Sequence, residues 1–458
     1  MKATTTIQIE LDNYLKRNGY TLQYFSEQSG INVGTLSRIV NGNRPISMEQ
    51  LDRLTAGMGL EEGTLYDLFV DDFFVHHSLN WRRLRPFLLR CAELKKYGCI
   101  QKILSYLLDD LKQIPNLFIT AEIMYENGWK EAAAILYSCV VETEKYQHAE
   151  RLAISQYRLF QLSLGSDTTI NLRAAIKFEP YKDRIPLNLR LDALLLLANI
   201  AFTLQDWAKM EYIADELLAL AQFVYSDREL KEEQTFKTER HLVVYYGQGY
   251  LIKSSALEHQ GRYEEAKEFI YGYADLSWFE GLDDEGVKEV EKFKLFAEAN
   301  LHNINLLMGN FEGLKDYLTF LTKYPHEVLP SSVIILMAAN KYHVRIDKVL
   351  DQLLGLIRAH KNNYYHEANY TNRYINFYYQ LALYQLNGME EDGIDNILRS
   401  LQISIKVNNT GRILDCISLY EKHKRFCTNE QRLTYEKMVK EANHNEKVNS
   451  FIDVTSQS

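Results

Sequence analysis

Apolar residues recur at helical spacing along almost the whole chain from Phe87 onward, and strand-like alternation is scarce. Turn signals interrupt this pattern at intervals of about 30 to 55 residues, a spacing typical of stacked helical hairpins. They lie near Gly98, Gly128, Gly165, Asp206, Gly261, Gly309, Tyr342 and Gly388. The pattern therefore predicts an all-α fold in which residues 87–458 form a helical-repeat solenoid.

Several of these units resemble tetratricopeptide repeats. In the stretch SSALEHQGRYEEAKEFI, Ala256 and Leu257 end one helix, Gly261 turns, and Tyr263 and Ala266 begin the next. A small residue lets two helices approach each other, and an aromatic ring fills the wedge between them. Such hairpins stack into an array whose concave surface is lined by the first helix of each pair.

A different pattern occupies the stretch from Thr21 to Val40. Thr21 is suited to cap a first short helix, Gly30 allows a sharp turn, and Asn32 is suited to cap a second helix over residues 33–40. Flanking apolar stripes predict further helices from Ile7, after Ser47, and over residues 61–68. Two short helices joined by a tight turn are typical of a helix-turn-helix that places its second helix in a DNA groove.

These five helices resemble the lambda-repressor-like domain of XRE-type regulators, and the run SGINVGTLSRIVNG carries the resemblance. We therefore expect a DNA-binding domain at residues 1–70, a linker at 71–86 and the repeat domain at 87–458. The linker contains Trp81 and a basic group formed by Arg82, Arg83 and Arg85. Those arginines either contact DNA phosphates or form a solvated face beside a buried tryptophan.

Charge and composition narrow the class of protein. The 458-residue chain is 46% hydrophobic and has a net charge of −9, which does not suit a protein that coats nucleic acid. Residues 13–47 nevertheless carry four positive side chains and one negative one. Five cysteines without a CxxC pair, no signal-type segment and no spanning apolar run indicate a cytoplasmic protein. No nucleotide, metal or hydrolase motif is present, so we expect no enzyme activity, metal or cofactor.

Asparagines inside predicted helices are the candidate ligand contacts, because an amide can donate to and accept from a peptide backbone at once. Each could equally be a surface or helix-packing residue. Tyrosines in the same region could add apolar walls with a polar tip. The predicted peptide-binding set is Asn199, Asn300, Asn303, Asn340, Asn376, Tyr245, Tyr374 and Tyr378.

An XRE-type domain followed by a tetratricopeptide-like array resembles the RRNPP family, including its Rgg-, PlcR- and AloR-like members. The resemblance implies a cytoplasmic quorum-sensing receptor that regulates transcription. It further implies a homodimer formed mainly by the repeats, a short signalling peptide in the concave groove, and a palindromic DNA operator. Two alternatives stay open: a regulator whose repeats serve only dimerisation or protein partners, and an adaptor that binds no DNA.

By motif position, the resemblance assigns base contacts to Val33, Gly34 and Arg38. Gly34 has no side chain, so Arg38 is the expected principal reader, and Leu22 replaces a glutamine that often contacts DNA in such domains. The remaining predicted DNA-facing residues are Asn32, Thr35, Ser37, Asn41, Asn43 and Arg44.

Overall fold

The computed structural model describes residues 6–42, 46–76, 80–107, 111–144, 149–227, 236–359, 367–388 and 392–455, and every regular element in these ranges is a helix. The predicted all-α fold is confirmed. The chain packs into two compact units, residues 1–162 and residues 163–458. Of the helices in the described residues, none combines the length and apolarity needed to cross a bilayer.

Unit 1 begins with five helices: α1 (Ile7–Asn18), α2 (Leu22–Ser29), α3 (Val33–Val40), α4 (Met48–Gly57) and α5 (Tyr66–His76). The fifth differs from the prediction over residues 61–68, because Gly63 has a φ of 82° and interrupts helical geometry before Tyr66. The unit continues through α6 (Trp81–Glu93), α7 (Tyr97–Leu107), η1 (Leu111–Gln113), α8 (Ile114–Glu126), α9 (Lys130–Glu144) and α10 (Glu150–Ser163).

The predicted linker is helical at both of its ends, and α6 packs on the N-terminal helices. Phe87 stacks on Phe69 with ring centroids 4.7 Å apart, and Arg83 Nη2 donates to the Ile46 carbonyl over 2.5 Å. One apolar core accordingly runs from Ile7 to Val140. The two compact units therefore meet after residue 162, and not at residue 70 or 86. The predicted domain boundaries at residues 70 and 86 stay a prediction.

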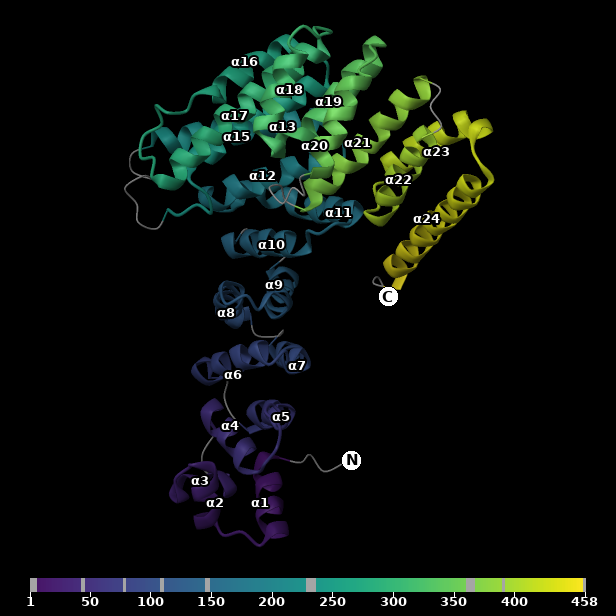
Figure 1. Ribbon diagram of the computed structural model, residues 1–458. Coiled ribbons are helices and arrows are strands. Elements are labelled where there is room, and N and C mark those ends of the chain that lie inside the picture. Colours follow the sequence, from purple (N-terminus) through teal and green to yellow (C-terminus); the bar gives the residue numbers. More distant parts are fainter. Residues whose placement is uncertain are drawn as a thin grey trace. The chain divides into compact units, whose positions relative to one another are not determined.

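Unit 2 consists of α11 (Thr168–Phe178) and η2 (Glu179–Arg184) followed by helical hairpins (Figure 1). The pairs are α12 (Leu187–Thr203) with α13 (Trp207–Ser226), α15 (Leu242–His259) with α16 (Tyr263–Ala274), α17 (Asp284–Leu307) with α18 (Leu314–Lys323), α19 (Val328–Tyr342) with α20 (Asp347–Ala359), α21 (Glu367–Asn387) with α22 (Asp392–Lys406), and α23 (Thr410–His423) with α24 (Asn429–Thr455). Two short 3-10 helices, η3 (Pro325–Glu327) and η4 (Lys424–Phe426), occur at hairpin junctions.

The turns predicted near Asp206, Gly261, Gly309, Tyr342 and Gly388 fall between the paired helices of unit 2, whereas Gly98 lies within α7 and Gly165 between α10 and α11. Gly261 and Gly309 have φ of 78° and 90°, a left-handed conformation that ends a helix with little strain in glycine. The first helices of successive pairs pack against each other, α15 on α17, α17 on α19 and α19 on α21. A helical array of the predicted kind is therefore present, while its specific likeness to tetratricopeptide repeats stays a prediction.

The array of unit 2 bends far enough for its beginning to meet the loop between α22 and α23. Thr168 Oγ1, in the first turn of α11, donates to the Asn408 carbonyl over 2.7 Å. Asn408 Nδ2 in turn donates to Asp167 Oδ2 over 2.8 Å. On the next helices, Asn372 Nδ2 of α21 lies 3.3 Å from Thr203 Oγ1 of α12. These contacts join segments far apart in the sequence, and Thr203 and Asn372 also line a cavity.

Candidate nucleic-acid interface and ligand cavity

The angle between α2 and α3 is set by caps and by a shared core. Thr21 Oγ1 accepts from the Tyr24 N–H over 3.2 Å, and Asn32 Oδ1 accepts from the Gly34 N–H over 2.9 Å. Gly30, between the two helices, has a φ of 63°. Phe25 of α2 and Leu36 of α3 are completely buried. The predicted helix-turn-helix is thus confirmed in its local geometry.

Leu36 and Ile39 of α3 point into the core and Val40 packs against it, so the opposite side of this helix is the one that faces outward. Arg38 is exposed, and its Nε donates to the Gly34 carbonyl one turn earlier over 3.0 Å. Its two Nη groups have no hydrogen bond within the described part of the chain, so they are available to an external acceptor. A bidentate contact to guanine uses such a fork of N–H donors.

The other predicted DNA-facing residues differ in what they can still offer. Asn41 Nδ2 donates to the Ser37 carbonyl over 2.8 Å, and the Asn32 side-chain oxygen is occupied by its cap. Asn32, Gly34 and Asn41 are exposed, while Val33, Thr35 and Ser37 are half-buried. Asn43 and Arg44 lie outside the described residues. Contact of any of these residues with DNA stays a prediction.

Two residues that hold the helix-turn-helix in shape were not identified from the sequence. Arg53 of α4 donates from Nη1 to the Gly30 carbonyl over 3.2 Å, and from Nη2 to Glu49. A Cβ at Gly57 would lie only 2.8 Å from the Ser29 Cβ, so α4 approaches α2 closely at this point. The i,i+4 spacing of Glu49 and Arg53 is a signal that could have identified the first of them.

Unit 2 contains a cavity of about 780 Å³, open to solvent, whose wall is formed chiefly by the first helix of each hairpin. This is the surface on which the repeat pattern places a ligand, and the volume suits a small-molecule or short-peptide site. Lining residues include Asn199 and Phe202 of α12, Trp207 of α13, Glu258 and His259 of α15, Lys292, Asn300 and Asn303 of α17, Met337 of α19, Asn376 of α21 and Arg412 of α23.

Four of the five predicted asparagines line this cavity, but their amides differ in availability. The side chain of Asn199 is exposed and makes no hydrogen bond to another described residue. Asn300 donates to the Tyr273 hydroxyl over 2.8 Å, and Asn303 accepts from the Tyr317 hydroxyl over 2.8 Å. Asn376 accepts from Arg412 Nη2 over 2.7 Å. The last three therefore also join neighbouring helices.

The remaining predicted ligand contacts lie outside the cavity lining. Asn340 Nδ2 donates to the Gln380 carbonyl over 3.0 Å, which ties α19 to α21. Tyr245 is fully buried and donates to Asp192 over 2.7 Å. Tyr374 and Tyr378 stack with ring centroids 6.0 Å apart and pack against the apolar core around α19. Residue type alone therefore did not distinguish side chains that pack helices together from side chains that line the cavity.

Charged residues of the cavity were the main omission from the sequence reasoning. Burial raises the pKa of Glu258 to about 7. Burial also lowers the pKa of the neighbouring His259, and the charge of Arg373 lowers it further. The His259 ring stacks on Trp207 with centroids 4.0 Å apart, and its Nδ1 lies 2.8 Å from the Ser255 carbonyl. The sequence signal for Glu258 and His259 is that two ionisable residues come directly after the apolar Ala256 and Leu257 in the stretch SSALEH.

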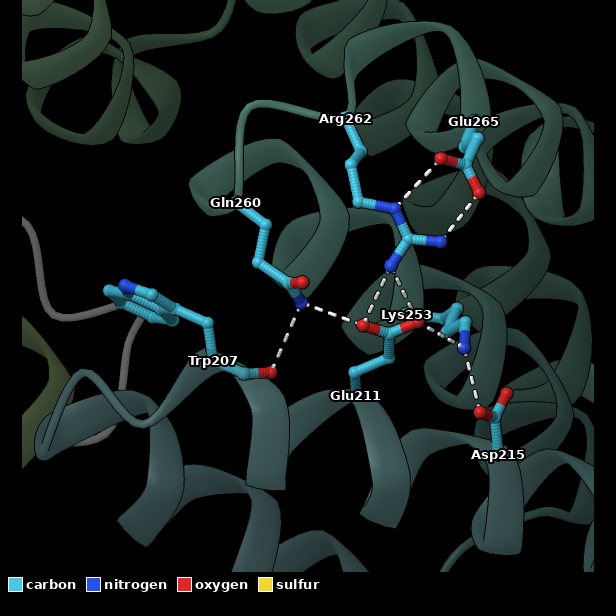
Figure 2. A network of polar contacts seen from close by, with 7 residues as sticks. All are labelled: Trp207, Glu211, Asp215, Lys253, Gln260, Arg262 and Glu265. Atoms are coloured by element: carbon cyan, nitrogen blue, oxygen red, sulfur yellow. Dashed lines mark hydrogen bonds and ion pairs between the residues drawn. The ribbon is translucent and has the colours of Figure 1, made fainter.

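A polar network braces the cavity wall where α13 meets α15 and α16 (Figure 2). Glu211 accepts from Lys253 over 2.8 Å, from Gln260 over 2.7 Å and from Arg262 over 3.0 Å. Although burial opposes the effect, the hydrogen bonds from Lys253 and Gln260 and the charges of Lys253 and Arg262 lower the pKa of Glu211 to about 2. The network fixes the end of α15, and with it Glu258 and His259, relative to α13.

Comparison with known proteins bears on unit 1 alone. The sequence model of a helix-turn-helix family matches residues 11–65, which include all of α2, α3 and α4. Searches of curated proteins and of solved structures gave no significant match. Together with the geometry of α2 and α3, the match shows that this chain carries an XRE-type helix-turn-helix domain of the kind found in DNA-binding transcription regulators.

Proposed function

We propose that the protein is a transcription regulator whose DNA binding is switched by a short peptide held in the cavity of unit 2. The observation that supports this proposal most is the cavity of about 780 Å³, lined by Asn199, Asn300, Asn303 and Asn376 from four first-helix positions. An extended peptide advances about 3.4 Å per residue, so five to ten residues would need roughly 17–34 Å of groove.

The chemistry of the wall favours a peptide over a purely apolar ligand. A linear peptide carries many backbone donors and acceptors, and each one left unpaired on burial costs about 1–3 kcal/mol. Asn199 offers a whole amide, and Asn300 and Asn376 each keep at least one N–H beyond the bonds they make to neighbouring helices. Trp207 and Phe202 add apolar surface.

Coupling to DNA would follow from the closed shape of the array. A ligand that touches α12 and α21 together would alter how these helices meet, and with them the closure between Thr168 and Asn408. α11 begins six residues after the end of unit 1, so a change there would be passed along the chain. A ligand shifts such an equilibrium only by its difference in affinity between the two arrangements. In a homodimer, this change would set the spacing of two recognition helices on a palindromic site.

Two measurements test the proposal against its alternatives. A gel shift with DNA from the promoter region next to the gene separates a DNA-binding regulator from an adaptor. Calorimetry with synthetic peptides encoded by neighbouring small reading frames, followed by the gel shift with and without the bound peptide, tests the switch. If the protein binds its promoter and no peptide alters that binding, a regulator that uses unit 2 for dimerisation or protein partners is the better description.

A further inference from the structure

Glu258 stands out among the ionisable side chains that line the cavity. It lies in the last turn of α15, and no hydrogen bond or ion pair joins its carboxylate to another residue that the structure describes. Ionised carboxylates taken out of bulk water are normally paired, because an unpaired one loses its hydration without compensation. The Glu258 carboxylate therefore lacks the positively charged partner that such a group normally has.

Other charged groups in the cavity have partners. Glu289 pairs with Lys292 one turn away on α17. Arg240 bonds Asp192 over 2.6 Å, and Arg412 bonds both Asn376 and Asp415. Among the described residues, these pairs occupy three of the cations that line the cavity, and the fourth, Arg373, lowers the pKa of His259 but has no effect on that of Glu258.

The neighbouring imidazole does not serve as the missing cation. His259 lies next in the chain, but burial and the charge of Arg373 lower its pKa, which keeps the ring neutral at physiological pH. Its Nδ1 faces the Ser255 carbonyl and its ring is stacked on Trp207. The pKa of Glu258 is raised by burial, and no neighbouring positive charge offsets that rise.

We propose that Glu258 binds a cationic group of the ligand, either the ammonium at the amino terminus of a peptide or the side chain of a basic residue. This inference rests on the proposed peptide-receptor function and narrows its ligand class. A cation in this position would regain for Glu258 the stabilisation that it lost on leaving water, since charge-assisted hydrogen bonds strengthen as the surroundings become less polar. It would also orient the peptide, because only one end or one side chain could occupy that position.

The test uses full-length protein and three synthetic pools of random hexapeptides built from uncharged amino acids. One pool has free amino termini, the second is acetylated, and the third is acetylated and carries one lysine. Bound peptides are separated with the protein by size exclusion and counted by mass spectrometry. We expect the wild-type protein to retain peptides of the first or third pool roughly tenfold more than those of the second.

Variants assign that preference to one carboxylate. Glu258→Gln should retain all three pools at the level of the acetylated one, and Glu258→Asp should keep a weaker preference for cationic peptides. Glu264→Gln is the matched control, since Glu264 is exposed on α16 outside the cavity lining, and it should behave as wild type. The wild-type comparison needs no variant, so misfolding of a variant would not remove the test.

The possible results distinguish a failure of the Glu258 cation site from a failure of the proposed peptide-receptor function. If wild-type protein retains acetylated uncharged peptides as well as cationic ones, or if Glu258→Gln keeps the preference, Glu258 is not the cation site although peptides bind. If wild-type protein retains no peptide from any pool, the peptide-receptor function fails and this inference fails with it. Whether the first or the third pool is retained distinguishes a terminal ammonium from a basic side chain.

Discussion

Replacing Glu258 by glutamine should stabilise the ligand-free protein at alkaline pH. Glutamine keeps the shape of the side chain and removes the charge that burial disfavours. The pKa of Glu258 is raised from its ordinary value of 4.5 to about 7. At about 1.36 kcal/mol per pKa unit, the ionised carboxylate would cost at most roughly 3 kcal/mol. Because the side chain remains partly exposed in the cavity, solvent screening reduces this to about 1–2 kcal/mol.

The sign of the pH dependence follows from the direction of the shift. The folded protein holds the proton of Glu258 more tightly than the unfolded chain does, so protonation favours folding. This contribution is complete below pH 4.5 and is lost as the pH rises through about 7. The wild-type protein loses this stability between about pH 4.5 and 7, whereas glutamine does not ionise. The stabilities of the two proteins should therefore differ only toward alkaline pH.

Thermal unfolding of full-length wild type and Glu258→Gln across this pH range measures the effect. With about 2–4 °C per kcal/mol for a unit of this size, the variant should unfold roughly 2–8 °C higher near pH 8 and at about the same temperature as wild type near pH 4. Equal unfolding temperatures near pH 8, or a less stable variant, would refute the reasoning. Glu211→Gln is the contrasting control: the lowered pKa of Glu211 stabilises the fold above pH 4.5 and is lost as pH falls toward about 2, so this variant should be less stable than wild type near neutral pH.

Four further predictions concern DNA, packing, the ligand and assembly. Arg38→Ala should lose roughly 1–3 kcal/mol of specific DNA binding with its helical circular dichroism unchanged, and full operator affinity in a gel shift would contradict this. Gly57→Ala should destabilise the helix-turn-helix by about 1–3 kcal/mol and lower its unfolding temperature, because the new Cβ would lie 2.8 Å from the Ser29 Cβ. Gly411→Ala is the control, since a Cβ there would have no neighbour closer than 3.9 Å. Asn199→Ala should weaken binding of the cognate peptide in calorimetry without changing the unfolding temperature, since its amide bonds no other described residue; unaltered peptide affinity would remove Asn199 from the site. Light scattering of the full-length protein should give about twice the monomer mass, and a clean monomer at micromolar concentration would argue against the proposed dimer.

The helix-turn-helix could be predicted from the sequence because its signals are local. The caps Thr21 and Asn32 accept from N–H groups three and two residues away, respectively, and the left-handed Gly30 needs no distant partner. Helical periodicity likewise predicted the paired helices of unit 2, and Gly261 and Gly309 marked their turns. The beginning of α5 was missed because Gly63 is a break that apolar spacing does not register.

Which polar side chains reach the cavity depended on packing between segments far apart in the chain. Asn199 and Tyr245 both read as polar residues on predicted first helices, yet one is exposed in the cavity and the other is buried against Asp192. Likewise, Asn340 donates to Gln380 of α21 away from the cavity lining, whereas Asn376 accepts from Arg412 of α23 and lines the cavity. Helical periodicity gives the direction of a side chain relative to its own helix, but the partner is set by how successive hairpins stack.

The chain's local patterns thus determined its helices, their turns and the second helix of the helix-turn-helix, since each rests largely on interactions within about four residues. Tertiary structure alone decided the closure of the array, through Thr168 and Asn408, and the isolation of Glu258. Whether a carboxylate is paired depends on every charge near it, and the charged residues that line this cavity come from segments as distant in sequence as Arg240, before α15, and Arg412 of α23. Electrostatic pairing is a property of three-dimensional neighbours, so no reading of residue order could supply it.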